Sequence, residues 1–266
     1  MPADSPLQPA SRPAVLGVVA VSVALAYSTW SGTWLRPLLD VEVIRSVPYL
    51  RSGLITLGDI VVFLALTCLA LRRSPGFVLG LSGLAAPVHR PAMFAALILI
   101  PALAFCLAVT PLSQESTFAD FAWKGALGPW LEEVLYRGLA IGVLVRLCGW
   151  PWLAACLWPA LFFGVAHASQ GAGFGEVAGI VGITAAGGLM FGWLYVRWGY
   201  NLWPAVFLHL VLNTLWMAFD FGENAIGGGM GNAVRTGVVI IAIFATLRLA
   251  PKSRSAAVRH DLDLDT

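Results

Sequence analysis

The sequence predicts an all-α membrane protein, a polytopic bundle of about eight transmembrane helices around an intramembrane polar cavity. Three observations carry this prediction. Of the 266 residues, 59% are hydrophobic and only 11% are charged, and the mean hydropathy is +0.82. The apolar residues gather in runs long enough to cross a bilayer. Several of these runs nevertheless contain ionisable side chains, which are costly in lipid unless they line a polar cavity.

The predicted spans are apolar runs separated by polar, glycine or proline residues. In order they are Ala14 to about Trp34, Leu54 to Leu71, Pro91 to Val109, about Gly128 to Arg146, Pro151 to Ala168, Val177 to Trp198, Leu202 to Phe221, and about Arg235 to Leu249. The first run is too long for a signal-peptide core, so it is a retained helix. Residues 1–12 are a predicted disordered lead, 13–250 the transmembrane domain, and 251–266 a polar tail.

Charge placement predicts the topology. Eight spans put both termini on one side of the membrane, and the side they share carries ten Lys and Arg against five on the other. By the positive-inside rule both termini lie in the cytoplasm, which fits a multi-pass protein of the plasma membrane. The net charge of +2 is too small to indicate a nucleic-acid partner. The four cysteines show no C-x-x-C spacing and are expected to be free apolar residues.

The fourth span holds three ionisable groups within six positions. Glu133 and Arg137 are four residues apart, acid first, which favours an ion pair on a helix. Glu132 points about 100° away and is the freer carboxylate, with Tyr136 one turn on as a hydrogen-bond partner. Two interpretations follow: a structural ion pair with Glu132 as a bystander, or a functional Glu132 supported by that pair.

Three further polar side chains fall at the same predicted depth in the outward half of the membrane. His167 ends the fifth span, and His209 and Asn213 share one face of the seventh. A carboxylate beside a histidine can hold and deprotonate water, while a second histidine and an amide can donate hydrogen bonds to an oxyanion. The set predicts a water-activating hydrolase.

Two other chemistries were weighed. Residues 80–83 read Gly-Leu-Ser-Gly, like the motif of a rhomboid-type serine protease, but a loop turn explains them better. No serine nucleophile is therefore expected. H-E-x-x-H is absent, yet Glu132, His167 and His209 are ordinary zinc ligands, so a divalent metal such as zinc stays open as a cofactor.

The motifs resemble a known family. Glu132-Glu133-x-x-x-Arg137, Phe163-x-x-x-His167 and His209-x-x-x-Asn213, in this order on three spans, are similar to the motifs of the CPBP intramembrane proteases. That family includes the type II CAAX prenyl endopeptidases and bacterial proteins of bacteriocin processing or immunity. The resemblance covers residues 126–215.

The resemblance implies a division of roles. Glu132 would be the general base, His167 would help to position the water, and His209 with Asn213 would bind the oxyanion; Glu133, Arg137, Tyr136 and Phe163 would be supporting. The substrate would be a protein or peptide with a membrane-associated segment, such as a C-terminal anchor or sorting signal, cleaved near that end. The alternatives are a non-catalytic immunity or scaffold protein and a transporter whose intramembrane charges form an ion path.

Overall fold

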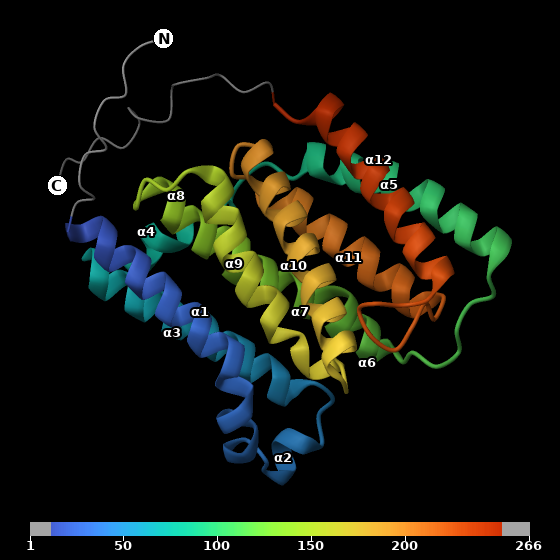
Figure 1. Ribbon diagram of the computed structural model, residues 1–266, viewed down its shortest axis with the longest axis horizontal. Helices are drawn as coiled ribbons and strands as arrows, with labels where there is room; N and C mark the ends of the chain where they lie inside the picture. The colour runs from blue at the N-terminus through green and yellow to red at the C-terminus, as the bar shows by residue number, and fades with distance from the viewer. Residues whose placement is uncertain (1–11, 252–266) are drawn as a thin grey trace.

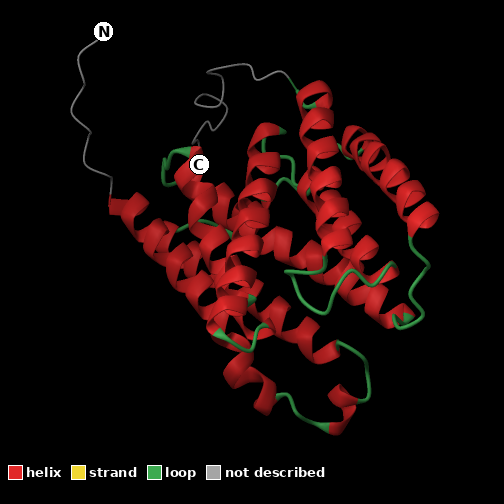
Figure 2. Ribbon diagram, turned by 45° about the vertical axis from the view of Figure 1, so that its right-hand side comes forward, coloured by secondary structure: helices red, strands yellow, loops and turns green. Residues whose placement is uncertain are grey.

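The computed structural model describes residues 12–251, and every regular element in this part of the chain is a helix (Figure 2). Apart from Arg12 and Pro251, the predicted lead and tail lie outside the described residues. Within residues 12–251, six helices are long and apolar enough to cross a membrane. The chain is a multi-pass helical membrane protein, as the composition predicts.

Each of these six helices corresponds to a predicted span, and five of them differ little from the predicted bounds. The six are α1 (Arg12–Leu38), α3 (Leu50–Leu71), α5 (His89–Val109), α9 (Trp152–Ala166, continued by the 3-10 turn η3, Ala168–Gln170), α10 (Phe174–Arg197) and α12 (Gly229–Leu249). α12 begins six residues before the predicted Arg235, so that arginine lies inside the helix. Two short helices, α2 (Glu42–Arg45) and α4 (Pro75–Gly80), lie in the connections.

The other two predicted spans take different forms. The seventh is α11 (Trp203–Ala218), whose 16 residues make it a shorter apolar helix. The fourth is a helical run that alternates between α and π geometry: α6 (Phe118–Asp120), η1 (Phe121–Leu127), α7 (Gly128–Glu133), η2 (Val134–Ile141) and α8 (Gly142–Arg146). The number eight therefore stays a prediction. π segments inside α-helices are rare and frequently mark functional sites.

The helices pack around two apolar cores. One joins α1 and α3 to α7, η2, α8 and α9, and includes Phe63, Leu139 and Tyr195. The other joins α5, α10, α11 and α12, and includes Phe94 and Leu208. In Figure 1 α1 and α3 run side by side at one edge of the bundle, and α5 and α12 cover the opposite edge. α10 contributes to both cores, so it ties the two halves together.

Glycines of α10 bring it into close contact with α9. A Cβ on Gly188 would lie 3.1 Å from Ala160 Cβ, and one on Gly192 would lie 3.0 Å from Cys156 Sγ. Gly182 and Gly187 have no neighbour within 4 Å of such a Cβ, so they serve no helix contact. The close approach of α9 and α10 therefore depends on Gly188 and Gly192 and not on Gly182 or Gly187.

Candidate functional site

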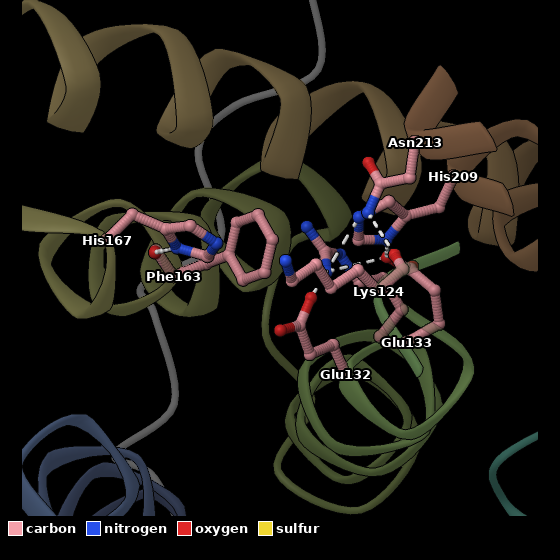
Figure 3. Close-up of polar contacts among 8 residues, drawn as sticks. Lys124, Glu132, Glu133, Phe163, His167, His209 and Asn213 are labelled. Carbon is pink, nitrogen blue, oxygen red and sulfur yellow. Dashed lines mark hydrogen bonds and ion pairs between the residues drawn. The ribbon is translucent and has the colours of Figure 1, made fainter. Parts of the chain in front are cut away.

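A cavity of about 790 Å³ opens inside the bundle and collects the predicted catalytic residues. Glu132 reaches it from α7, His167 from the end of α9, and His209 and Asn213 from α11; Phe163 of α9 also lines it. Figure 3 shows these side chains facing one another from three separate helices. The four residues therefore line one cavity, and their chemical roles stay predictions.

The two adjacent glutamates occupy opposite environments. The Glu133 side chain is fully buried, with 0% exposed, whereas the Glu132 side chain is 33% exposed and faces the cavity. This follows from α geometry over residues 128–133, since neighbouring residues point about 100° apart. Glu132 is therefore open to water and substrate, and Glu133 belongs to the packed interior.

Arg137 forms the predicted ion pair with Glu133. Its Nη1 lies 2.9 Å from Glu133 Oε1, and both side chains are at most 1% exposed. The guanidinium also lies 4.3 Å from the ring centre of Phe163 and 5.1 Å from that of Phe191. Cation–π contact and a carboxylate together compensate a buried cation that would otherwise be strongly destabilising.

His209 lies between the two carboxylates. Its Nδ1 is 2.8 Å from Glu133 Oε1, and its Nε2 is 3.9 Å from Glu132 Oε2. An ionised carboxylate can only accept, so Nδ1 carries a proton and donates to Glu133. Phe191 stacks on the imidazole with ring centres 4.8 Å apart. Glu133 therefore fixes the ring so that Nε2 faces Glu132.

His167 is held by its own helix. Its Nδ1 lies 2.7 Å from the carbonyl oxygen of Phe163, so Nδ1 donates. A neutral ring then presents Nε2 as an acceptor. The Phe163 ring lies 4.6 Å from the His167 ring and 6.1 Å from the His209 ring, measured between centres. Phe163 thus separates and orients the two histidines, a role consistent with the predicted supporting function.

Asn213 is oriented by the π segment η1. Its Nδ2 donates to the carbonyl oxygen of Lys124 at 2.9 Å, and both residues line the cavity. An amide nitrogen carries two hydrogens, so the second stays available to a bound group. Lys124 is itself anchored by an ion pair of 2.8 Å to Asp120. This support for Asn213 is absent from the sequence motifs.

One smaller expectation, the hydrogen bond between Tyr136 and Glu132, is wrong. The Tyr136 hydroxyl lies 3.5 Å from Ser28 Oγ and is not bonded to Glu132; its ring packs edge-on against Phe163 at 5.1 Å. Ser82 is fully buried and accepts the N–H of Leu84, outside the cavity lining. The Gly-Leu-Ser-Gly segment is a turn, as expected, because Gly83 has φ +76.

The three candidate zinc ligands do not form a ligand set. Glu132, His167 and His209 line one cavity. Yet within residues 12–251 no group of three or more His, Cys, Asp or Glu side chains is placed to hold a metal ion. A zinc cofactor at this site therefore stays a prediction that the placement of these residues does not support. All four cysteines are free, as predicted.

The fold and the cavity together define a multi-pass membrane protein with an internal polar site built from carboxylate, imidazole and amide groups. Residues 114–215 match the family model described as type II CAAX prenyl endopeptidase Rce1-like. The matched segment is similar to that family, and at the level of the family the match supports a membrane-embedded peptide hydrolase. The match contains Glu132, His167, His209 and Asn213. No curated protein and no solved structure matches the chain.

Proposed function

We propose that this protein is an intramembrane endopeptidase that cleaves a peptide bond near the membrane-associated end of its substrate, with Glu132 activating the attacking water. One observation carries the proposal: a partly exposed carboxylate faces Nε2 of a histidine whose Nδ1 is held by a buried carboxylate. That arrangement offers both a base and a hydrogen-bond donor within one water-accessible cavity.

The reaction follows from the positions of the groups. Glu132 takes a proton from a water that also donates a hydrogen bond to His167 Nε2. The resulting hydroxide oxygen bonds to the scissile carbonyl carbon, whose oxygen becomes negative. Asn213 Nδ2 donates to that oxyanion, and His209 also donates from Nε2 when the ring carries a second proton taken up from water, with its Nδ1–H still bonded to Glu133. When the C–N bond breaks, Glu132 returns its proton to the leaving amine, which restores the starting state.

The buried groups hold this machinery in place. Glu133 orients His209, and Arg137 balances the charge of Glu133 in the interior. Neither Glu133 nor Arg137 lines the cavity, so both act through their neighbours. Preorganised donors cost no reorganisation during the reaction, which is why such supporting contacts contribute to rate.

The cavity of about 790 Å³ has room for a short peptide segment, since pockets for drug-sized ligands span roughly 300–1,000 Å³. The substrate is a protein or peptide with a membrane-associated segment, such as a C-terminal anchor. With both termini in the cytoplasm of a plasma-membrane protein, the cavity opens outward, which favours exported or membrane-anchored substrates.

The test compares Glu132→Gln with the wild type in cells that lack the native protein. The membrane proteome is searched for a C-terminal segment that accumulates uncut. We expect Glu132→Gln to accumulate it while remaining folded and in the membrane. Glu115→Gln is the matched control, because Glu115 is an exposed carboxylate lining the same cavity. Near-normal cleavage by Glu132→Gln would refute the proposal.

A further inference from the structure

An arginine from outside the matched family segment lines the cavity. Arg235 lies in α12, is half-buried, and lines the same cavity as Glu132 and His209. Residues 114–215 do not include it. A charge within an apolar helix is costly and usually has a partner or a task. The question is therefore which group compensates the Arg235 cation.

The contacts of Arg235 are all with neutral groups. Its guanidinium carbon lies 4.4 Å from the ring centre of Trp216, and its Nη2 donates to the carbonyl oxygen of Ala225 at 2.8 Å. Ala225 is itself tied down, since its N–H donates to Gln170 Oε1. The guanidinium is thus held in one orientation by a stacked ring and a carbonyl. Among the described residues, most of its five N–H groups have no hydrogen-bond acceptor.

Within the described residues, the carboxylates that line the cavity form no ion pair with Arg235. Asp220 and Glu223 line the cavity from the α11–α12 loop, yet no ion pair joins either to Arg235 among residues 12–251. Lys124, the other Lys or Arg of the lining, is already neutralised by Asp120. Across the described lining, Arg235 is therefore the one fixed cation without a carboxylate partner.

We infer that Arg235 binds a carboxylate of the peptide substrate and so sets which peptides the cavity accepts. This inference rests on the proposed peptidase function. An arginine fork matches a carboxylate with two parallel N–H···O bonds, and stacking on an aromatic ring leaves its edge free for them. The carboxylate belongs either to the substrate's C-terminus or to an acidic side chain, and the site chemistry is the same for both.

Binding is tested apart from cleavage, with the full chain in non-ionic detergent and calorimetric titration. The probes are N-acetyl-Leu-Leu-Leu as the free acid, its C-terminal amide, and the amide of N-acetyl-Leu-Asp-Leu. We expect the wild type to bind at least one carboxylate probe about tenfold or more tightly than the neutral amide. Preference for the free acid assigns the C-terminus, and preference for the aspartyl amide assigns a side chain.

Variants test whether Arg235 causes the preference for a carboxylate probe. Arg235→Gln should remove the preference, and Arg235→Lys should keep part of it because the charge remains while the fork is lost. Arg197→Gln is the matched control, since Arg197 also donates to a main-chain oxygen, that of Pro251, but lies outside the cavity lining. Equal binding of all three probes by the wild type, or no binding of any, overturns the inference.

If Arg235→Gln keeps the preference for a carboxylate probe, the inference about Arg235 is also wrong. The wild-type comparison of acid and amide needs no variant, so a failure of Arg235→Gln to fold does not remove the test. Loss of cleavage in Glu132→Gln addresses the catalytic proposal alone, because the peptide titration measures no turnover. The two proposals can therefore fail separately.

Discussion

The buried pair of Glu133 and Arg137 allows a quantitative prediction. Replacing Arg137 by Met keeps an unbranched side chain against the rings of Phe163 and Phe191 but removes the cation. Glu133, with none of its side chain exposed, then keeps only His209 as a partner. Breaking a buried pair by removing one member typically costs about 3–5 kcal/mol, because the remaining charge is left uncompensated.

For a chain of this size each kcal/mol lowers the melting temperature by about 2–4 °C, so Arg137→Met should melt at least about 6 °C below the wild type. The assay is thermal unfolding in detergent followed by far-UV circular dichroism. Arg51→Met is the control, since Arg51 pairs with Asp40 at 3.2 Å on the surface. An exposed pair contributes only about 0–1 kcal/mol, so that variant should melt close to the wild type.

A double-mutant cycle separates the pair from other effects of each change. Glu133→Gln combined with Arg137→Met removes both charges together. The double variant should be more stable than the sum of the single effects predicts, by about 0.5–3 kcal/mol, as for other residues in contact. If Arg137→Met melts within about 2 °C of the wild type, or the two effects simply add, the argument that this pair supports the site is wrong.

Three further predictions concern topology, nucleophile and pH. A cysteine at Gly173, where a Cβ meets nothing within 4 Å, should react with a membrane-impermeant thiol reagent in intact cells, whereas one at Gly76 should react only after lysis; the reverse pattern would invert the topology. Ser82→Ala should keep cleavage, because Ser82 lies outside the cavity, and its loss with normal expression would favour a serine nucleophile. The Lys124 ammonium holds the pKa of Asp120 well below its usual range. The stability that this carboxylate contributes should be present above about pH 4 and fall as the pH drops. The melting difference between the wild type and Asp120→Asn should therefore shrink below pH 4, and a constant difference would contradict it.

Much of the site could be predicted because it depends on spacing within single helices. Glu133 and Arg137 pair as their i,i+4 spacing predicts, and Glu132 faces away as the helical angle requires. His209 and Asn213 share one face of α11 for the same reason. Periodicity within a helix is written in the sequence, so these features need no knowledge of the fold.

Contacts between helices could not be predicted in this way. Nothing in the spacing says that His209 bonds Glu133, that Asn213 bonds the Lys124 carbonyl, or that Phe191 covers Arg137. These depend on the rotation and depth of one helix against another, which packing decides. The π segments on either side of residues 128–133 also change the local phase. The sequence of an apolar run does not indicate where such π segments form.

The residues proposed to catalyse cleavage and the residue proposed to select the peptide lie in different parts of the chain. Glu132, His167, His209 and Asn213 all lie in the segment that matches the family. His209 is fixed by buried Glu133, His167 by the Phe163 carbonyl and Asn213 by the Lys124 carbonyl. Arg235 enters the same cavity from α12, beyond that segment. It is fixed by Trp216 and by the α11–α12 loop rather than by the buried ion pair. A change at Arg235 can therefore alter which peptide binds without disturbing Glu133 or His209. If this separation holds, Arg235 variants will change the KM of a carboxylate-bearing substrate more than its kcat, and Asn213 variants will lower kcat.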